Sequence, residues 1–202
     1  MIIIDCEQGK EEWFTEKAGR PGASSFSKIV TTKGEHSKSA KDYLYQLAGE
    51  TIVGLKAETY QNAIMQRGIE LEPAARNLFE MIYDVEVQQV GLCYPDAQKK
   101  YLCSPDGLIE DAGLEIKCPL IHTHVSYLLE DKLPTAYFQQ VQGSMAVTGL
   151  NSWWFMSYFP GMAPFTIKVD RDESFIEKLK AELDTFCMNL AMTVKKLKEM
   201  AA

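Results

Sequence analysis

The stretch Ser104-Pro105-Asp106-Gly107, followed by Leu114-Glu115-Ile116-Lys117-Cys118-Pro119, decides how the fold is interpreted. It predicts a β-hairpin, because Pro-Asp-Gly is typical of a turn and the second stretch is typical of a short strand. Side chains two residues apart leave the same face of a strand, so Glu115 and Lys117 should lie side by side. Asp106, at the turn, can lean over that face.

These residue types suit metal-assisted cleavage of a phosphodiester bond. Two carboxylates can hold a divalent cation through oxygen ligands, and a neighbouring lysine can orient a water and stabilise charge on a phosphate. The plain alternative is an ordinary turn followed by a solvated Glu-x-Lys strand. The apolar neighbours Leu108, Ile109, Leu114 and Ile116 favour a site. Charges inside an apolar hairpin are costly unless they serve one another or a metal.

Length and composition bound the class of protein. The 202 residues contain no repeat and no linker-like tract, so we expect a single domain over residues 1–202. No apolar run approaches the length of a membrane span and no signal peptide is evident, so we expect a cytoplasmic protein. Five scattered cysteines without Cys-x-x-Cys spacing favour reduced thiols over disulfides or zinc.

The net charge of −7 is weak evidence for or against a nucleic-acid partner, because net charge does not determine the local potential. Basic residues do concentrate in about the first fifth of the chain, although solubility explains such a spread equally well. They are Lys10, Lys17, Arg20, Lys28, Lys33, Lys38 and Lys41.

Periodicity and turn residues predict the order of the elements. Helices are expected at 8–18, from Ser24 or Ser25 (as the N-cap) to Val30, and at 39–53, 60–83, 122–129, 136–148 and 173–200. Pro73 should kink the fourth helix or begin a new first turn. Strands are expected at 85–92, 101–103, in the hairpin, and at 151–159 and 165–169. This order predicts an α/β fold, a small mixed β-sheet flanked by α-helices.

Several short motifs resemble, in content and order, one known family. They are Trp13 with Lys17 to Arg20, Ala23 to Phe26, Arg67 to Glu72 with Ala75-Arg76, the hairpin motif, and Ala136-Tyr137 with Gln140-Val141-Gln142. Together they span about residues 13–145 and resemble the YqaJ-like viral recombinases. This is the lambda exonuclease family, within the restriction-endonuclease-like PD-(D/E)xK superfamily. The resemblance implies a restriction-endonuclease-like core.

The resemblance also implies roles at a metal centre. Asp106 and Glu115 would be the metal-binding carboxylates, with the backbone carbonyl of Ile116 as a further ligand. Lys117 would be the catalytic lysine. Glu72 would contact the metal through water or complete a second metal site; a helix acid in a first turn, before Pro73, is the plain alternative. Family spacing favours Glu72 over Glu70.

Further residues are implied around this centre. Gln140 would orient the nucleophile or the lysine, although a surface polar residue is an equal alternative without the resemblance. Ser24 would bind a terminal 5′-phosphate, and a helix N-terminus suits that role, as it suits a plain N-cap. Spacing puts Lys17 where the family has an arginine, while Arg20 is the nearest arginine. Arginine and lysine are not equivalent at a phosphate, so either residue remains the candidate.

The function implied is a Mg²⁺-dependent exonuclease with one or two ions per site, for which Mn²⁺ would substitute. It would degrade the 5′-terminated strand of linear double-stranded DNA and leave 3′ overhangs for phage-type recombination by strand annealing. A ring-shaped homotrimer, a single-strand annealing protein as partner, and a phage or prophage gene expressed in a bacterial host are also implied. The alternatives are a sequence- or structure-specific endonuclease and a non-catalytic DNA-end-binding module. The aromatic run Trp153 to Phe155 and the last helix could form an interface or belong to the core.

Overall fold

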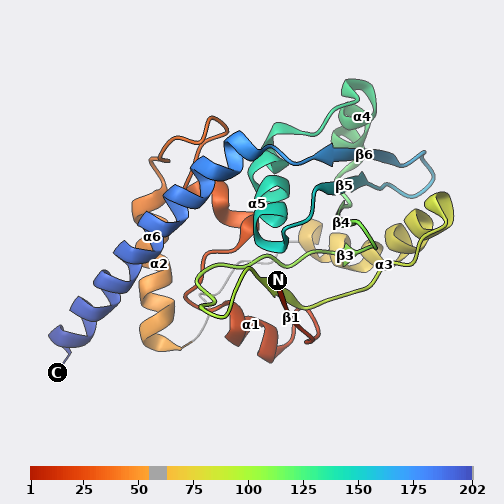
Figure 1. The fold of residues 1–202 in the computed structure, drawn as a ribbon. Coiled ribbons are helices and arrows are strands. Elements are labelled where there is room, and N and C mark those ends of the chain that lie inside the picture. Colours follow the sequence, from red (N-terminus) through yellow and green to blue (C-terminus); the bar gives the residue numbers. More distant parts are fainter. Residues whose placement is uncertain (55–62, 202) are drawn as a thin grey trace.

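The computed structural model describes residues 1–54 and 63–201 of the chain (Figure 1). A four-stranded sheet in the order β3-β4-β5-β6 forms its centre. Its strands are β3 (Gly107–Leu108), β4 (Ala112–Lys117), β5 (Ser152–Ser157) and β6 (Phe165–Asp170). The pair β4–β5 is parallel and the two outer pairs are antiparallel, so the sheet is mixed. Apart from it, β1 (Ile2–Ile4) pairs with β2 (Leu92–Tyr94).

The parallel pair is joined by a helical crossover, which parallel strands require. It consists of α4 (Ile121–Glu130), the short 3₁₀-helix η2 (Thr135–Tyr137) and α5 (Phe138–Thr148). Helix α5 ends at Gly149, whose φ of 79° places it in the left-handed region that glycine adopts without strain. The crossover therefore brings α5 back across the sheet directly after the hairpin.

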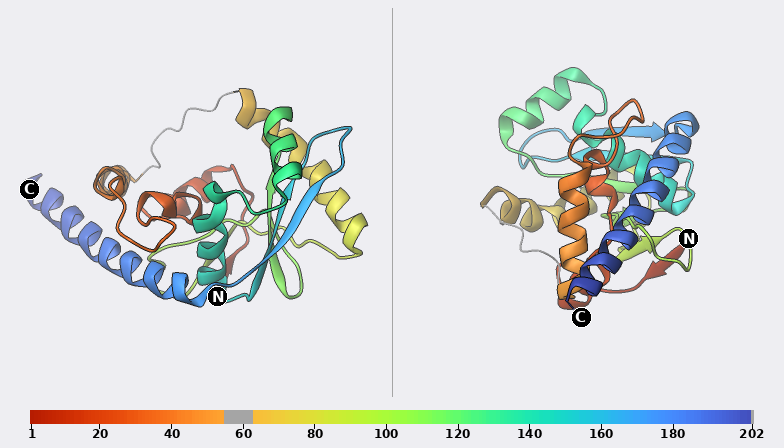
Figure 2. Two further views of the ribbon diagram at one scale, coloured as in Figure 1. Left: turned by 90° about the horizontal axis from the view of Figure 1, so that it is seen from above. Right: turned by 90° about the vertical axis from the view of Figure 1, so that its left-hand side faces the viewer.

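Helices cover both faces of the sheet (Figure 2). On one face, α3 (Ala63–Tyr83) packs Ala75 and Phe79 in one apolar cluster with Leu114 and Ile116 of β4. Successive strand residues alternate between faces, so Glu115 and Lys117 leave the other face of β4, toward α5. The buried Leu–Ile pair thus anchors the strand while its two charged neighbours stay free for other partners.

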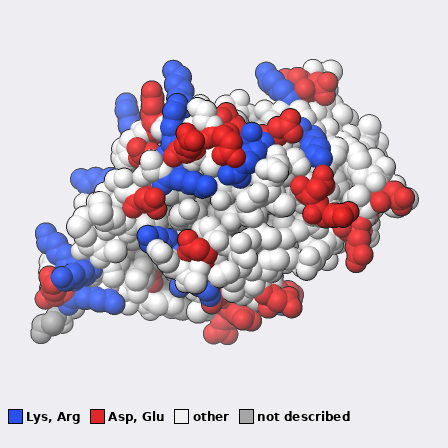
Figure 3. Space-filling model, in the orientation of Figure 1, with Lys and Arg blue, Asp and Glu red and all other residues white. Residues whose placement is uncertain are grey.

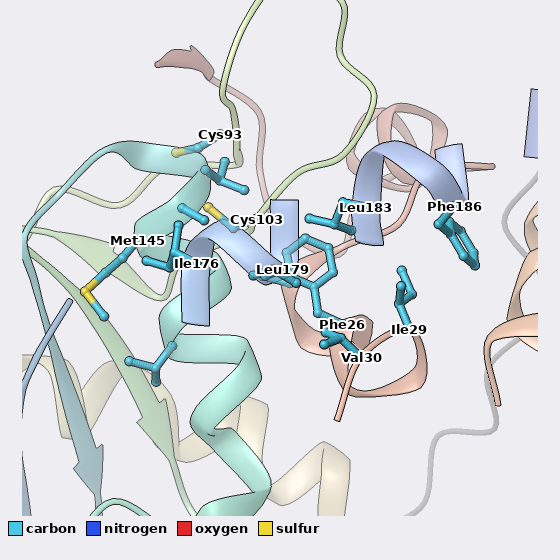
Figure 4. Packing of buried hydrophobic residues seen from close by; sticks show 14 of the residues in the cluster. Phe26, Ile29, Val30, Cys93, Cys103, Met145, Ile176, Leu179, Leu183 and Phe186 are labelled. Atoms are coloured by element: carbon cyan, nitrogen blue, oxygen red, sulfur yellow. The ribbon is translucent and has the colours of Figure 1, made fainter. Parts of the chain in front are cut away.

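The larger core lies between α5 and the helices on its other side. These are the 3₁₀-helix η1 (Ala23–Lys28), α2 (Ala40–Val53) and α6 (Glu173–Met200). Phe26, Leu179 and Leu183 meet in its middle (Figure 4). Asp172 caps α6, since its side chain accepts a hydrogen bond from the Phe175 N–H at 2.9 Å. The buried residues of α6 end at Leu190, and the last turns extend beyond the body of the molecule (Figure 1).

The predicted fold class is confirmed, as a small mixed sheet flanked by helices. Three local predictions are wrong. Residues 85–91 form no strand, only a single bridge from Gln88 to Leu108, because the facing strand β3 is two residues long and cannot support a ladder; Leu92 is the first residue of β2. Tyr101 to Cys103 is likewise reduced to isolated bridges. Strand β1 was not predicted at all.

The helix starts also differ from expectation. The N-cap of η1 is Gly22, and Ser24 and Ser25 lie inside a six-residue 3₁₀-helix. Helix α3 continues through Pro73, so this proline does not begin a new helix. The predicted start of that helix, at 60–62, lies outside the described residues. Trp153 and Phe155 are fully buried and belong to the core. Within the described chain, no helix is both long and apolar enough to cross a bilayer.

Replacing Gly143 with alanine should destabilise the protein by about 1–3 kcal/mol, the usual cost of overpacking. A Cβ at this position on α5 would lie 2.4 Å from Cδ2 of Phe26, a buried residue of η1. The matched control is Gly49→Ala on α2, where a Cβ meets no atom within 4 Å. That change should be neutral or stabilise by up to about 1 kcal/mol. Urea unfolding of both variants checks the contrast, and equal effects would contradict the packing described.

Candidate active site

The hairpin folds Asp106 back over the edge of β4. The Asp106 N–H donates to the Leu114 carbonyl at 3.1 Å, and Gly107 pairs with Leu114 in the register of the two strands. The Ile116 N–H then donates to Oδ2 of Asp106 at 2.6 Å. Because β3 is so short, the edge of β4 from Glu115 onward is not covered by a strand, and the Asp106 side chain takes that place.

Glu115 and Lys117 lie side by side, as their spacing predicts. The Lys117 ammonium donates to Oε1 of Glu115. From α5, Nε2 of Gln140 donates to the same oxygen at 2.6 Å. Glu115 is only 2% exposed. The hairpin and the crossover helix therefore hold one buried carboxylate between a cation and an amide, with Asp106 beside it.

Burial dominates the electrostatics of these carboxyl groups. The pKa of Glu115 is raised to about 7, chiefly by burial; Lys117 opposes this rise and the charge of Asp106 adds to it. Burial also raises the pKa of Asp106, which Lys117 and the Ile116 N–H partly offset. For Lys117, burial lowers the pKa, but Glu115 and Asp106 raise it more, so that it lies above its usual value. The buried carboxylates of Glu115 and Asp106 therefore favour binding of a further positive charge, either a proton or a metal cation.

A helix acid approaches the hairpin from the opposite face of the sheet. Glu72 of α3 pairs with Arg76, one turn further along, and Nε of Arg76 donates to the Asp106 carbonyl oxygen at 3.1 Å. Burial and then the charge of Asp106 raise the pKa of Glu72, which places the two carboxylates within electrostatic reach. Sequence reasoning gave Arg76 no role, although a Glu-x-x-x-Arg spacing on a helix signals such a pair.

A second arginine of the same helix holds the end of β4. Nη1 of Arg67 donates to the carbonyl oxygens of Cys118 and Pro119, at 3.1 Å each. Its guanidinium also lies over the ring of Phe159, 4.8 Å from the centroid. Sequence reasoning quoted Arg67 within a motif without a role. The structure gives it a contact that fixes the chain where it leaves β4 for α4.

A cavity of about 170 Å³ joins this cluster to the N-terminal part of the chain. The residues that sequence reasoning singled out and that line it are Lys17, Ser24, Asp106, Glu115, Lys117 and Gln140. Of the described candidates, Arg20, Glu72 and Ile116 do not line it. Arg20 instead donates from Nη1 to the Glu16 carbonyl at 2.6 Å and faces a separate, larger hollow.

The N-terminal wall of the cavity is fastened to the hairpin by polar contacts. Helix α1 (Glu11–Lys17) carries Trp13, whose Nε1 donates to Oγ of Ser104 at 3.0 Å. The Lys17 ammonium lies over the Trp13 ring, 3.7 Å from its centroid. Before the helix, Nε2 of Gln8 donates to the Pro105 carbonyl at 2.9 Å. Gln8 and the Trp13–Ser104 contact escaped sequence analysis because each joins residues far apart in the chain.

The oxygen atoms at the hairpin suit a hard divalent cation such as Mg²⁺. In the hydrogen bonds of the described residues, Oδ1 of Asp106 and Oε2 of Glu115 accept none. The Ile116 carbonyl points to the same edge as its N–H, which faces Asp106. No group of three or more His, Cys, Asp or Glu side chains in the described chain could hold a metal alone. Two carboxylates and a carbonyl fit Mg²⁺, which commonly keeps several waters.

The buried carboxyl group predicts a specific pH dependence of stability in EDTA. The pKa of Glu115 is raised from 4.5 to about 7 in the folded chain, so between these values the native state holds a proton that the unfolded state has released. The free energy of unfolding should therefore fall as pH rises from about 4.5 to about 7. Since one pKa unit corresponds to about 1.4 kcal/mol, the fall due to this group should be on the order of 3 kcal/mol.

Glu115→Gln should flatten that part of the pH profile, because it removes the titrating group. Urea unfolding across the pH range measures the slope, and Glu177→Gln, at an exposed position of α6, is the control. If the profiles of the parent and Glu115→Gln run parallel, the electrostatic account of this carboxyl group is wrong.

Comparison with known proteins agrees with this architecture. Residues 12–151 match the family model of the YqaJ-like viral recombinase domain. The chain is similar to LHK-Exo, an alkaline exonuclease from Laribacter hongkongensis. The two share 31% identity and a TM-score of 0.86, covering 95% of this chain and 98% of that one. A crystal structure of LHK-Exo in complex with dAMP matches to the same extent.

A phage-related exonuclease from Haemophilus somnus 129PT shares the fold. Its identity is 17% and its TM-score 0.69, over 90% of this chain and 96% of that one. No curated protein matches significantly. The family model spans more than half of the chain, and LHK-Exo is similar over nearly all of it. The chain therefore belongs to the YqaJ-like viral recombinase family, a membership that implies a nuclease.

Proposed function

We propose that this protein is a Mg²⁺-dependent exonuclease that hydrolyses the 5′-terminated strand of linear double-stranded DNA and leaves 3′ single-stranded overhangs. The observation that carries the proposal is the cluster of Asp106, Glu115, Lys117 and Gln140 on one wall of a single cavity. An acid pair, a lysine and an amide, held by a hairpin and its crossover helix, are the groups that metal-assisted phosphodiester hydrolysis needs.

Asp106, Glu115 and the Ile116 carbonyl are the proposed metal ligands. A divalent cation held there would supply Lewis acidity and neutralise charge on the phosphate. Glu72 would act through water or complete a second site, and Arg76 would hold it against the hairpin. Mn²⁺ should substitute for Mg²⁺, since the donors are oxygen atoms.

The side chains around these ligands have separable tasks. Lys117 orients the attacking water and stabilises negative charge on the phosphate, for which its raised pKa keeps it protonated at neutral pH. Gln140 donates to Oε1 of Glu115 and so fixes which oxygen of that carboxylate faces the cavity. The Ile116 N–H fixes Oδ2 of the Asp106 carboxylate, and Arg76 holds the backbone carbonyl of the same residue. These contacts hold the reacting groups in place before substrate arrives.

Recognition of a 5′-phosphorylated end is proposed for the N-terminal residues that line the same cavity. The Ser24 side chain is exposed and lines the cavity with Lys17, so a hydroxyl and an ammonium face the catalytic cluster. Lys17 is preferred to Arg20 because Arg20 faces the other hollow. The complex of LHK-Exo with dAMP supports a mononucleotide as the product that such a site releases.

A ring-shaped homotrimer and a single-strand annealing protein as partner are also proposed, on the strength of family membership. A closed ring would keep the enzyme on its substrate by topology, because DNA threaded through it can leave only at an end. This proposal predicts that the enzyme degrades the DNA molecule it holds to completion before it attacks another.

One assay separates this function from its alternatives. With Mg²⁺, the 5′-terminated strands of linear duplex DNA should be released as mononucleotides and the complementary 3′ strands should remain, while covalently closed plasmid stays intact; EDTA should stop the reaction. Cleavage of the covalently closed plasmid, which has no free end, would indicate the sequence- or structure-specific endonuclease. Binding of DNA ends without any cleavage would indicate a non-catalytic module.

A further inference from the structure

A second hollow, of about 840 Å³, lies apart from the catalytic cavity. The outer half of α6, the end of α2, the turn after α1 and the loop at 98–100 surround it. We call this the α6 groove. Its floor on α6 is formed by Leu190, Ala191 and Val194. The proposed catalytic residues do not line it, so the proposed function leaves it unexplained.

The floor belongs to a stripe of α6 that continues beyond the core. Leu190 is the last residue of α6 in the buried core and Val194 packs against it only in part. Further along this stripe, Leu197 is 38% exposed. The helix projects past the end of α2 at this point (Figure 2). An apolar helix face thus extends into solvent without a partner among the described residues.

The rim of the groove is basic although the whole chain is acidic, with a net charge of −7. Its basic residues are Arg20, Lys99, Lys100, Lys195 and Lys198. Of the described residues that line it, only Glu199 is acidic. Basic side chains gather visibly at the C-terminal end of α6 (Figure 3).

Two of these lysines have acidic neighbours. Lys99 lies 3.3 Å from Glu16, and Lys195 lies 3.9 Å from Glu199. Surface ion pairs of this kind contribute little free energy, so a partner's carboxylates can replace them at low cost. The rim therefore remains attractive to a negatively charged ligand.

We propose that the α6 groove docks an acidic, amphipathic helix from a partner protein. The apolar stripe of such a helix would cover Leu190, Ala191 and Val194, and its carboxylates would meet the lysines of the rim. This occupant is favoured over single-stranded nucleic acid because none of the described lining residues is an aromatic on which a base could stack.

The test uses two fluorescein-labelled peptides of about 16 residues. The first places leucines three and four residues apart, so that they form one helical stripe, with glutamates on the other positions; the second has lysine in place of each glutamate. Fluorescence anisotropy with the full-length protein should show binding of the acidic peptide only. Lys198→Glu should weaken it at least about tenfold. Lys196→Glu, about 200° away around the helix, should leave it within about twofold. Ala191→Glu, at an exposed floor position, should also weaken binding.

The proposal is overturned if the acidic peptide fails to bind the parent protein. It is also overturned if the peptide binds Lys198→Glu and Lys196→Glu with the same affinity, or if either of the next two results is found. A labelled single-stranded oligonucleotide binds in its place and is lost in Lys198→Glu, which assigns the groove to nucleic acid. Sedimentation shows that Lys198→Glu dissociates an assembly, which assigns the groove to a second copy of the chain. Peptide binding is independent of cleavage, so failure here leaves the proposed nuclease function standing.

Discussion

Replacing Lys117 with alanine should lower the rate of DNA cleavage at least a hundred- to a thousandfold, about the loss expected for one preorganised electrostatic group. The ammonium lies against Glu115 at the edge of the cavity, where it can reach a phosphate. The fold should persist, because Glu115, with a pKa of about 7, can take up a proton when its cation is removed. Circular dichroism and the turnover of linear duplex check both statements.

Asp106→Ala should be equally inactive but should differ in its response to metal. Mg²⁺ should raise the Tm of the parent and of Lys117→Ala, since binding to the native state stabilises it by mass action. It should not raise the Tm of Asp106→Ala, which lacks one proposed ligand. Lys196→Ala, on the far side of α6, serves as the control. Turnover within about tenfold of the parent, only about 1.4 kcal/mol, would contradict the assignment of either residue.

Removing the 5′-phosphate from a linear duplex should slow its degradation about ten- to a hundredfold. A charge-assisted contact is worth about 1.5–3 kcal/mol, and the Lys17 ammonium and Ser24 hydroxyl supply such contacts. Ser24→Ala should therefore slow cleavage of phosphorylated ends and leave hydroxyl ends almost unchanged. Helix polarity carries no part of this expectation, since η1 is a six-residue 3₁₀-helix capped by Gly22.

The two basic candidates can be separated on the same substrates. Lys17→Ala should narrow the gap between phosphorylated and hydroxyl ends, whereas Arg20→Ala should preserve it, because only Lys17 lines the cavity. A larger effect of Arg20→Ala would move the phosphate site to the other side of α1. If Ser24→Ala, Lys17→Ala and Arg20→Ala all distinguish phosphorylated from hydroxyl ends as the parent does, the phosphate site does not lie in this cavity.

Local rules predicted the hairpin and its charged face well. The two-residue period of a strand requires Glu115 and Lys117 to share a face, whatever the rest of the chain does. Helical spacing likewise predicted α6 to within a residue of its observed ends. Such features depend on residues close in sequence, so a single sequence contains the information.

Features that depend on distant segments were missed or misjudged. Residues 85–92 resemble a strand, but a strand needs a partner, and β3 offers only two residues. Gly22 rather than Ser24 is the N-cap of η1, whose first N–H, that of Ala23, donates to the Leu102 carbonyl at 2.9 Å. The contacts of Arg76 with Asp106 and of Gln8 with Pro105 are equally remote in sequence. Composition and periodicity carry no record of such tertiary contacts.

The two walls of the cavity come from separate parts of the chain. The residues proposed for chemistry that line the cavity lie within 106–140, in the hairpin and its crossover, while Lys17 and Ser24 belong to the N-terminal segment. A unit with mostly local contacts is expected to assemble early in folding, before the N-terminal segment docks through Trp13 and Ser104. Evolution can then exchange the docked segment without rebuilding the reaction centre. A chimera carrying a relative's first thirty or so residues should inherit that relative's preference for DNA ends.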